Sequence, residues 1–194
     1  MTANTSEQVY SAKKVRAVAG TVVLALLPSP HVLLISSRSD PSRWILPKGG
    51  YERKDGPSPL SAALRETWEE AGVRCVHTDA AVLLGELDHT PGGKPNKPQR
   101  FWWYGYAVER VDGTGEPALA ECAAGPEWPE HAIRARMWFP LAEARKVLTK
   151  KNMVPALEWA VAHYNLTTEP PSILPPAPLV DTIIPVFGIG SSAN

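Results

Sequence analysis

The sequence predicts an α/β fold in which a mixed β-sheet packs against one helix from the middle of the chain and one or two helices from its C-terminal part. Three observations support this prediction. Runs rich in valine, leucine and aromatic residues recur between turn signals, as strands do. One central segment has the N-cap, the apolar period and the glycine stop of a helix. Two later segments are amphipathic at helical spacing.

The first predicted element is a β-hairpin formed by residues 15–27 and 31–36. Both runs are apolar, and Pro28-Ser-Pro30 separates them with residues that favour turns. A short apolar run follows at residues 44–46 and ends at a proline. The glycine pair at 49–50 then predicts a loop.

A helix is predicted from about Ser58 to Ala71. Ser58 is suited to the N-cap because its hydroxyl can accept a free backbone N–H, and Pro59 is suited to the first helical position. Apolar residues then recur at intervals of three and four. Gly72 is a suitable C-terminal stop because it can adopt the left-handed conformation.

The second half of the chain predicts further strands and two helices. The strands are predicted at residues 80–87, 101–108 and 136–139, and the helices at 141–149 and 154–164. Residues 89–99 hold three prolines and two glycines, so they predict a loop.

Length and composition indicate one domain with two flanking segments. We expect a polar arm at residues 1–12, a single domain at 13–166, and a proline-rich tail at 167–194. The two cysteines are too few for a disulfide framework, and no Cys/His spacing suggests zinc.

The same composition argues against several kinds of partner. No apolar run is long enough to span a membrane, and the N-terminus has no signal-peptide pattern. The formal net charge is zero, so the chain as a whole does not attract nucleic acid. We therefore expect a monomeric cytoplasmic protein, with the nucleus as a second location, that binds neither membrane nor nucleic acid.

Three glutamates in the central helix form the most informative cluster. Glu66, Glu69 and Glu70 stand at i, i+3 and i+4, so their carboxylates share one helical face. Like charges at this spacing destabilise a helix unless a cation lies beside them. Oxygen ligands favour a hard cation such as Mg²⁺ or Mn²⁺. An acidic face exposed to solvent is the alternative interpretation.

The residues around these glutamates resemble the Nudix box, G-x5-E-x7-R-E-U-x-E-E-x-G-U with U aliphatic. Arg65-Glu66, Glu69-Glu70 and Gly72-Val73 match the second half of this pattern. Thr67 stands where an aliphatic residue is usual. The preceding loop is one residue longer than the pattern, so the early glutamate falls on Pro57, and Glu52 or Asp55 is left to take its role.

A longer stretch resembles one branch of that family, the diphosphoinositol polyphosphate phosphohydrolases. Residues 34–38, 43–50, 65–72 and 128–144 carry this similarity, which covers roughly residues 13–164. The resemblance implies the Nudix α/β/α sandwich, with the catalytic helix after a Gly-Gly loop. It also implies hydrolysis of phosphoanhydride bonds in inositol pyrophosphates, diadenosine polyphosphates and inorganic polyphosphate.

The resemblance further implies roles for single residues. Glu66, Glu70 and the carbonyl of Gly49 or Gly50 would hold Mg²⁺, with Mn²⁺ as a substitute, and Glu69 would be the general base. The substrate would be a small polyanion. The residues expected to contact it are Lys14, Arg16, Ser37, Arg38, Lys48, Gly49, Gly50, Lys97, Arg100, Arg134 and Arg136. Scattered solvated charge is the alternative for each basic group.

Two other functions stay open on the sequence. The first is a pyrophosphatase of the same chemistry that acts on nucleoside polyphosphates or on cap-like substrates. The second is a Nudix domain that has lost catalysis and only binds a ligand or partner. The presence of all three helix glutamates favours an active enzyme.

Overall fold

The structure is a computed structural model that describes residues 15–26, 29–75, 80–90, 98–108, 128–148, 150 and 152–167. The expected N-terminal arm, the tail beyond residue 167, and the predicted contact residues Lys14 and Lys97 lie outside these ranges. The strands are β1 (Arg16–Ala25), β2 (His31–Ser37), β3 (Asp40–Ile45), β4 (Lys48–Gly50), β5 (Val82–His89), β6 (Gln99–Val108) and β7 (Arg136–Pro140). The helices are the short 3-10 helix η1 (Arg53–Asp55), α1 (Pro59–Ala71), α2 (Leu141–Val147) and α3 (Val154–His163).

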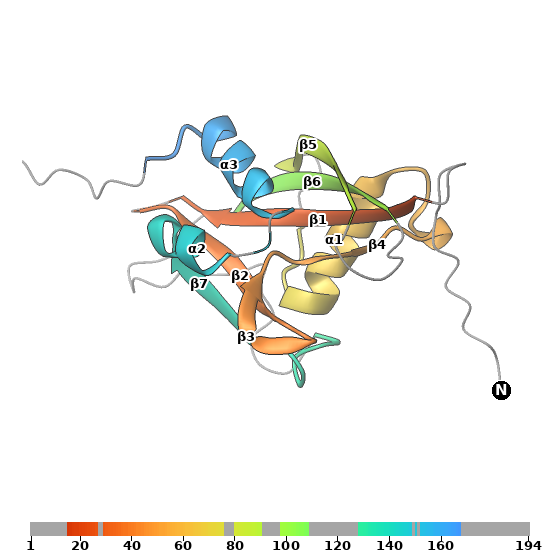
Figure 1. Ribbon diagram of the computed structural model, residues 1–194, viewed down its shortest axis with the longest axis horizontal. Helices are drawn as coiled ribbons and strands as arrows, with labels where there is room; N and C mark the ends of the chain where they lie inside the picture. Colours follow the sequence, from red (N-terminus) through yellow and green to blue (C-terminus); the bar gives the residue numbers. More distant parts are fainter. Residues whose placement is uncertain are drawn as a thin grey trace, which may run out of the picture.

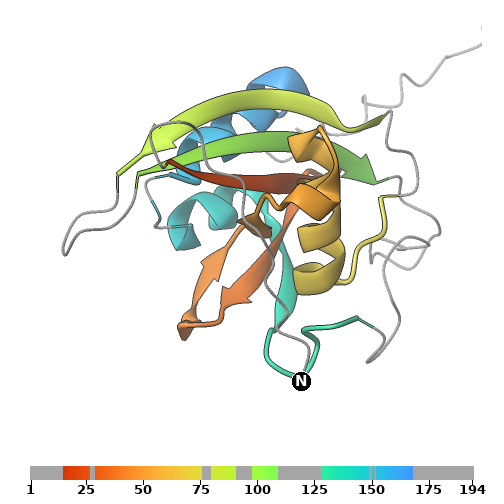
Figure 2. The ribbon, with the colours of Figure 1, turned by 90° about the vertical axis from the view of Figure 1, so that its right-hand side faces the viewer.

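The strands form one mixed sheet with the order β3-β2-β1-β6-β5, to which β4 adds beside β1 and β7 beside β2 (Figures 1 and 2). β1 and β6 pair in parallel over their whole length, from Arg16 opposite Gln99 to Ala25 opposite Val108. The other pairings are antiparallel. The predicted mixed sheet is therefore confirmed.

The predicted hairpin is present, but on the side away from β6 the strand β1 pairs with two strands, β2 and β4. Only its end pairs with β2, whereas its first half pairs with β4, with Val18 opposite Gly50 and Gly20 opposite Lys48. The prediction of a loop at residues 49–50 is therefore wrong. The two glycines favour a turn locally, but the unpaired backbone groups of β1 give them a strand partner.

Helix α1 begins and ends where the sequence predicts. The hydroxyl of Ser58 accepts the N–H of Leu60 at 3.2 Å. Gly72 has φ +67°, and its N–H reaches the carbonyls of Thr67 and Trp68. A methyl group on Gly72 would also lie 2.7 Å from the ring of Trp128, so both conformation and packing require glycine there.

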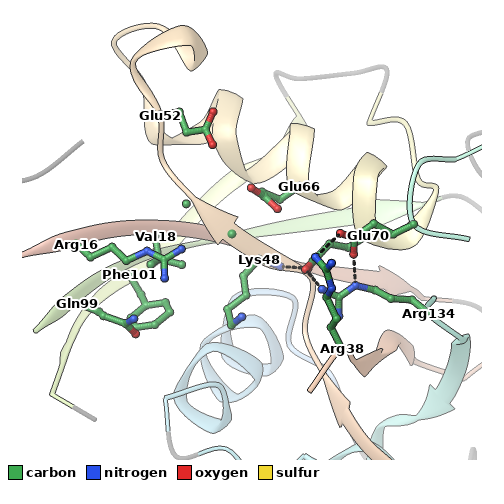
Figure 3. A pocket seen from close by; sticks show the side chains of 13 residues that line it. Arg16, Val18, Arg38, Lys48, Glu52, Glu66, Glu70, Gln99, Phe101 and Arg134 are labelled. Atoms are coloured by element: carbon green, nitrogen blue, oxygen red, sulfur yellow. Dashed lines mark hydrogen bonds and ion pairs between the residues drawn. The ribbon is translucent and has the colours of Figure 1, made fainter. Parts of the chain in front are cut away.

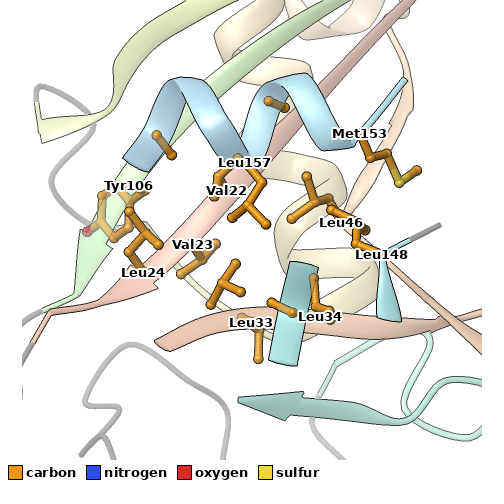
Figure 4. Packing of buried hydrophobic residues seen from close by; sticks show 14 of the residues in the cluster. Val22, Val23, Leu24, Leu33, Leu34, Leu46, Tyr106, Leu148, Met153 and Leu157 are labelled. Atoms are coloured by element: carbon orange, nitrogen blue, oxygen red, sulfur yellow. The ribbon is translucent and has the colours of Figure 1, made fainter. Parts of the chain in front are cut away.

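Two packed clusters lie on opposite faces of the sheet, which gives three layers. On one face, Ala62 and Ala63 of α1 pack against Ala17 and Ala19 of β1. On the other face, the larger cluster includes buried residues from α2 and α3 (Figure 4). This cluster contains Val22, Leu24, Leu46, Leu141, Leu148, Met153, Ala156, Leu157 and Ala160. The α/β/α arrangement expected from the resemblance is confirmed. In the described part of the chain, no helix has the length and apolar character needed to cross a membrane.

The departure at Thr67 has a local explanation. Its side chain is fully buried, and its hydroxyl donates to the carbonyl of Ala63 at 2.6 Å. The hydroxyls of Thr67 and Thr21 also lie 2.6 Å apart, which joins α1 to β1. A hydrogen-bonded pair thus replaces the aliphatic contact that the family pattern has at this position.

Candidate active site

A cavity of about 330 Å³ lies between α1, the strands β1, β4 and β6, and the turn that precedes β7 (Figure 3). Its lining residues come from segments that are far apart in the sequence. They are Arg16, Val18, Arg38, Lys48, Gly49, Gly50, Glu52, Glu66, Glu70, Gln99, Phe101, Glu130 and Arg134. The cavity therefore contains two of the three box glutamates and four of the basic residues expected to contact substrate.

Glu66 and Glu70 project from successive turns of α1 toward β4, and Gly49 is the residue that makes room for Glu66. A methyl group on Gly49 would lie 1.9 Å from the carboxyl carbon of Glu66. The carbonyl of Gly50 already accepts Arg65 Nη2 at 2.9 Å, which leaves Gly49 as the better candidate for a metal ligand. Two carboxylates and a backbone carbonyl are oxygen donors that suit Mg²⁺.

The loss of solvent around both carboxylates raises their pKa values by more than their cationic partners lower them. Burial raises the pKa of Glu66 to about 7, although Arg65 at 2.8 Å opposes the shift. Burial also raises the pKa of Glu70, against the charges of Lys48 and Arg134. Among the described residues no three acidic, histidine or cysteine side chains converge on one point, and Glu66 and Glu70 instead face arginines. A divalent cation would offset this cost, so the donor set fits the metal that the resemblance implies.

Asp55 is the acid that pairs with the box arginine. Arg65 Nε donates to Asp55 Oδ1 at 2.7 Å, and Nη1 donates to Glu66 at 2.8 Å and to Glu69 at 2.9 Å. The Asp55 side chain is only 3% exposed, so this pair is well shielded from water. The other candidate for this role, Glu52, lines the cavity instead.

Glu69 does not face the cavity. Its side chain is 35% exposed and pairs with Arg65 one turn earlier on the helix. Glu69 follows Glu66 by three positions and directly precedes Glu70, so its side chain lies at the solvent side of the face that the three glutamates share. Its role as general base stays a prediction.

The four basic residues in the cavity differ in how far they are already paired. Arg16 has a buried Nε with no hydrogen-bond acceptor in the described part of the chain. Lys48 is partly buried, and the loss of solvent around it lowers its pKa. Arg38 is 72% exposed, whereas Arg134 is 7% exposed and pairs with Glu70 and with a second carboxylate.

Three predicted contact residues lie outside the cavity. The Ser37 side chain is buried, and its hydroxyl lies 3.2 Å from that of Ser39. Arg100 pairs with Asp88 at 2.7 Å on the exposed side of β6, because strand alternation turns it away from the inward-facing residues on either side. Arg136 donates to the carbonyl of Ala71 at 2.7 Å and therefore caps the end of α1.

Sequence reasoning missed several lining residues. Gln99 and Phe101 flank Arg100, so strand alternation at this position would have pointed to them. Glu130 lies in a turn with no motif of its own, and only the tertiary structure brings it to the cavity.

Comparisons with known proteins show the family to which the chain is similar. A family model described as "NUDIX domain" matches residues 17–160. Diphosphoinositol polyphosphate phosphohydrolase 2 of Mus musculus is 30% identical over 167 residues, which cover 84% of this chain and 82% of that protein. Diphosphoinositol polyphosphate phosphohydrolase 3-alpha of Homo sapiens is 54% identical over 120 residues, which cover 61% of this chain and 60% of that protein.

Solved structures show the same fold at low sequence identity. A C. elegans Ap4A hydrolase in a binary complex aligns with a TM-score of 0.50 and 23% identity, over 78% of this chain and 98% of that chain. The NUDIX domain of Shewanella oneidensis NrtR, crystallised with ADP ribose, aligns with a TM-score of 0.57 and 16% identity, over 80% of this chain and 94% of that chain. At these sequence identities the structural similarity supports the fold and nothing beyond it.

Proposed function

The chain belongs to the Nudix hydrolase family, and on that premise we propose that it hydrolyses phosphoanhydride bonds of diphosphoinositol polyphosphates with Mg²⁺, or Mn²⁺ in its place. Diadenosine polyphosphates and inorganic polyphosphate are the further substrates that we expect. The relatives named as diphosphoinositol polyphosphate phosphohydrolases support the first assignment.

The observation that carries the proposal is the charge pattern of the cavity. Four cationic and four anionic side chains line it, so its formal charge is balanced. The cations are Arg16, Arg38, Lys48 and Arg134, and the anions are Glu52, Glu66, Glu70 and Glu130. Bound divalent cations would leave this cavity strongly positive. Such a site favours a ligand with many phosphates, which can use metal and arginine together.

The residues divide the chemistry between them. Glu66, Glu70 and the carbonyl of Gly49 would hold Mg²⁺, which when bound offsets charge that develops on the phosphoryl oxygens and lowers the pKa of bound water. Arg16 and Lys48 orient the phosphates from the sheet side. A carboxylate near the metal accepts the proton of the attacking water.

Glu69→Gln is expected to lower turnover about 10²–10⁴-fold if Glu69 is that base. The change keeps the size of the side chain and leaves Glu66 and Glu70 intact, so Mn²⁺ affinity measured by calorimetry should change little. Glu66→Gln is the matched comparison, because it should weaken Mn²⁺ binding as well as turnover. Near-normal turnover of Glu69→Gln at saturating Mg²⁺ would assign the base to another carboxylate, for instance the loop residue Glu52, which lines the cavity.

The nucleoside-polyphosphate alternative is tested by direct competition between substrates. We expect higher kcat/KM for diphosphoinositol pentakisphosphate than for diadenosine hexaphosphate, both measured with Mg²⁺ and with Glu70→Gln as the inactive control. A preference for the dinucleotide would overturn the substrate assignment. No metal-dependent hydrolysis of either compound would instead favour a domain that only binds. Monomeric state, cytoplasmic or nuclear location and the lack of nucleic-acid binding stay predictions.

A further inference from the structure

Glu130 lies in the turn before β7 and faces the cavity, although no part of the Nudix box contains it. The turn is fixed to the catalytic helix, because the Glu130 N–H donates to the carbonyl of Glu69 at 3.0 Å. Within the turn, the N–H groups of Ile133 and Arg134 both donate to the Glu130 carbonyl at 3.0 Å. The position of this carboxylate is therefore determined by the backbone on both sides.

The Glu130 carboxylate is directed at two arginines of the cavity, with one oxygen toward each. Arg134 Nε donates to Oε2, and Arg38 Nη1 lies 4.0 Å from Oε1. The other two nitrogens of Arg134 are also engaged, Nη1 with the carbonyl of Ser36 at 2.9 Å and Nη2 with Glu70. Each nitrogen of Arg134 therefore already donates to a protein acceptor, and a phosphate could use only the second N–H of each terminal nitrogen.

The opposite end of the cavity differs, as Figure 3 shows with Arg16 and Arg38 on its two sides. No carboxylate pairs with Arg16 among the described residues, and its buried Nε has no acceptor there. A phosphate can therefore bind at the Nε of Arg16 without displacing any group in the described part of the chain. At the Arg38–Arg134 end, a phosphate instead meets the Glu130 carboxylate, which accepts from Arg134 Nε and lies 4.0 Å from Arg38 Nη1.

We propose that Glu130 is a specificity-determining residue that competes with substrate phosphates for Arg134 and Arg38. It lowers the affinity of the cavity for dense polyanions and leaves single phosphate groups at Arg16 nearly unaffected. The repulsion between a fixed carboxylate and a ligand grows with ligand charge, so the effect is largest for the most phosphorylated compounds. This inference rests on the proposed polyanionic substrate but not on its hydrolysis.

The test is binding of inositol hexakisphosphate and of pyrophosphate, measured by calorimetry without divalent cations at moderate salt. We expect Glu130→Gln to bind the hexakisphosphate about tenfold more tightly than the wild type, and pyrophosphate within about threefold of it. Glu143→Gln is the matched control, because Glu143 pairs with Lys146 on the exposed side of α2 and should change neither affinity. Unchanged or weaker binding of the hexakisphosphate by Glu130→Gln would overturn the proposal.

A second measurement needs no variant and so does not depend on the folding of one. The Nε–H signal of Arg134 in a ¹H–¹⁵N spectrum of the wild type should shift as inositol hexakisphosphate is added, because its acceptor changes from carboxylate to phosphate. The shift should saturate with the calorimetric binding curve. An Arg134 signal that stays in place while the ligand binds would overturn the proposal. Because neither experiment measures turnover, failure of the hydrolytic assignment would be seen separately.

Discussion

The missing side chain at Gly49 leaves the space that the Glu66 carboxylate occupies. Gly49 belongs to β4, where any residue could form the ladder with β1, so its backbone pairing alone does not demand glycine. The carboxyl group of Glu66 occupies the space that a Cβ would need. The requirement for glycine is therefore a requirement of the site and not of the fold.

Gly49→Ala is expected to lower Mn²⁺ affinity and kcat/KM by about 100-fold, because the Glu66 carboxylate must leave its position, while the sheet pairing persists. Titration with Mn²⁺ and steady-state kinetics measure the two effects. Gly56→Ala is the control: it has open space around it, but φ +82° with ψ −159° is a conformation that favours glycine, so it should cost about 1–3 kcal/mol of stability and leave metal affinity unchanged. Equal metal affinity in Gly49→Ala and the wild type would contradict the argument.

The raised pKa of Glu66 should also make the stability of the folded protein depend on pH, and a bound metal should remove this dependence. Its pKa is raised from 4.5 to about 7 in the folded protein, so between these values the folded state holds the proton more tightly than the unfolded chain. Stability should therefore fall as pH rises through this window, by at most about 3 kcal/mol from this group.

Urea denaturation without divalent cations at pH 5 and pH 8 measures that loss, and Glu66→Gln should show a smaller one, because the raised pKa of Glu70 remains. Mg²⁺ should stabilise the wild type more at pH 8 than at pH 5, because it binds the charged carboxylate. An identical pH profile in the wild type and Glu66→Gln would show that burial of Glu66 has no such effect.

At the scale of the elements, the ion pair between Asp55 and Arg65 joins η1 to α1. Asp55 also accepts the N–H of Glu52 at 2.9 Å, and Arg65 reaches the Gly50 carbonyl at the end of β4. Three consecutive elements are thus tied together at the arginine of the box. Burial tends to raise the pKa of Asp55, but its hydrogen bonds with Arg65 and the charge of that residue keep the pKa below its ordinary value.

Asp55→Asn is expected to cost about 2 kcal/mol, because it leaves a mostly buried arginine with one charged partner fewer. The loss is measured as a lower free energy of unfolding at pH 7. Asp40→Asn is the matched control: the partners of Asp40 are its near neighbours Ser42 and the largely exposed Arg43, so little change in stability is expected. If the free energy of unfolding falls as little in Asp55→Asn as in Asp40→Asn, the prediction is wrong, and the ion pairs with Glu66 and Glu69 are enough to stabilise Arg65.

At the scale of the whole molecule, the fold brings together cavity-lining residues that lie more than a hundred positions apart in the sequence. The parallel pair β1–β6 places Arg16 opposite Gln99, and the turn before β7 brings Glu130 and Arg134 to the end of α1. All lining residues fall between positions 16 and 134, inside the range of the family match at 17–160 except for the first.

Deletion of residues 168–194 is expected to leave kcat/KM within about threefold of the full chain, because the family match ends at residue 160 and every lining residue of the described chain is kept. Far-ultraviolet circular dichroism would show that the shortened protein is folded, and steady-state kinetics would show its activity. A tenfold or larger fall in a folded protein would place part of the tail in the site or in the fold.

The sequence by itself determined the features that depend on neighbouring residues. The caps of α1 at Ser58 and Gly72, the shared face of Glu66 and Glu70, and the alternating apolar strands are all written in short spacings, so local physics was enough to predict them. The metal face and the family followed from the same local pattern.

Only the tertiary structure decided the features that depend on distant partners. The glycines of β4 became a strand because β1 had an unpaired edge, Asp55 rather than Glu52 met Arg65, and Arg100 and Arg136 turned away from the cavity. Basic residues carry no local signal that separates a phosphate contact from a surface charge or a helix cap. That choice is made by which chain segment packs beside them, because a charge finds its partner in space and not along the sequence.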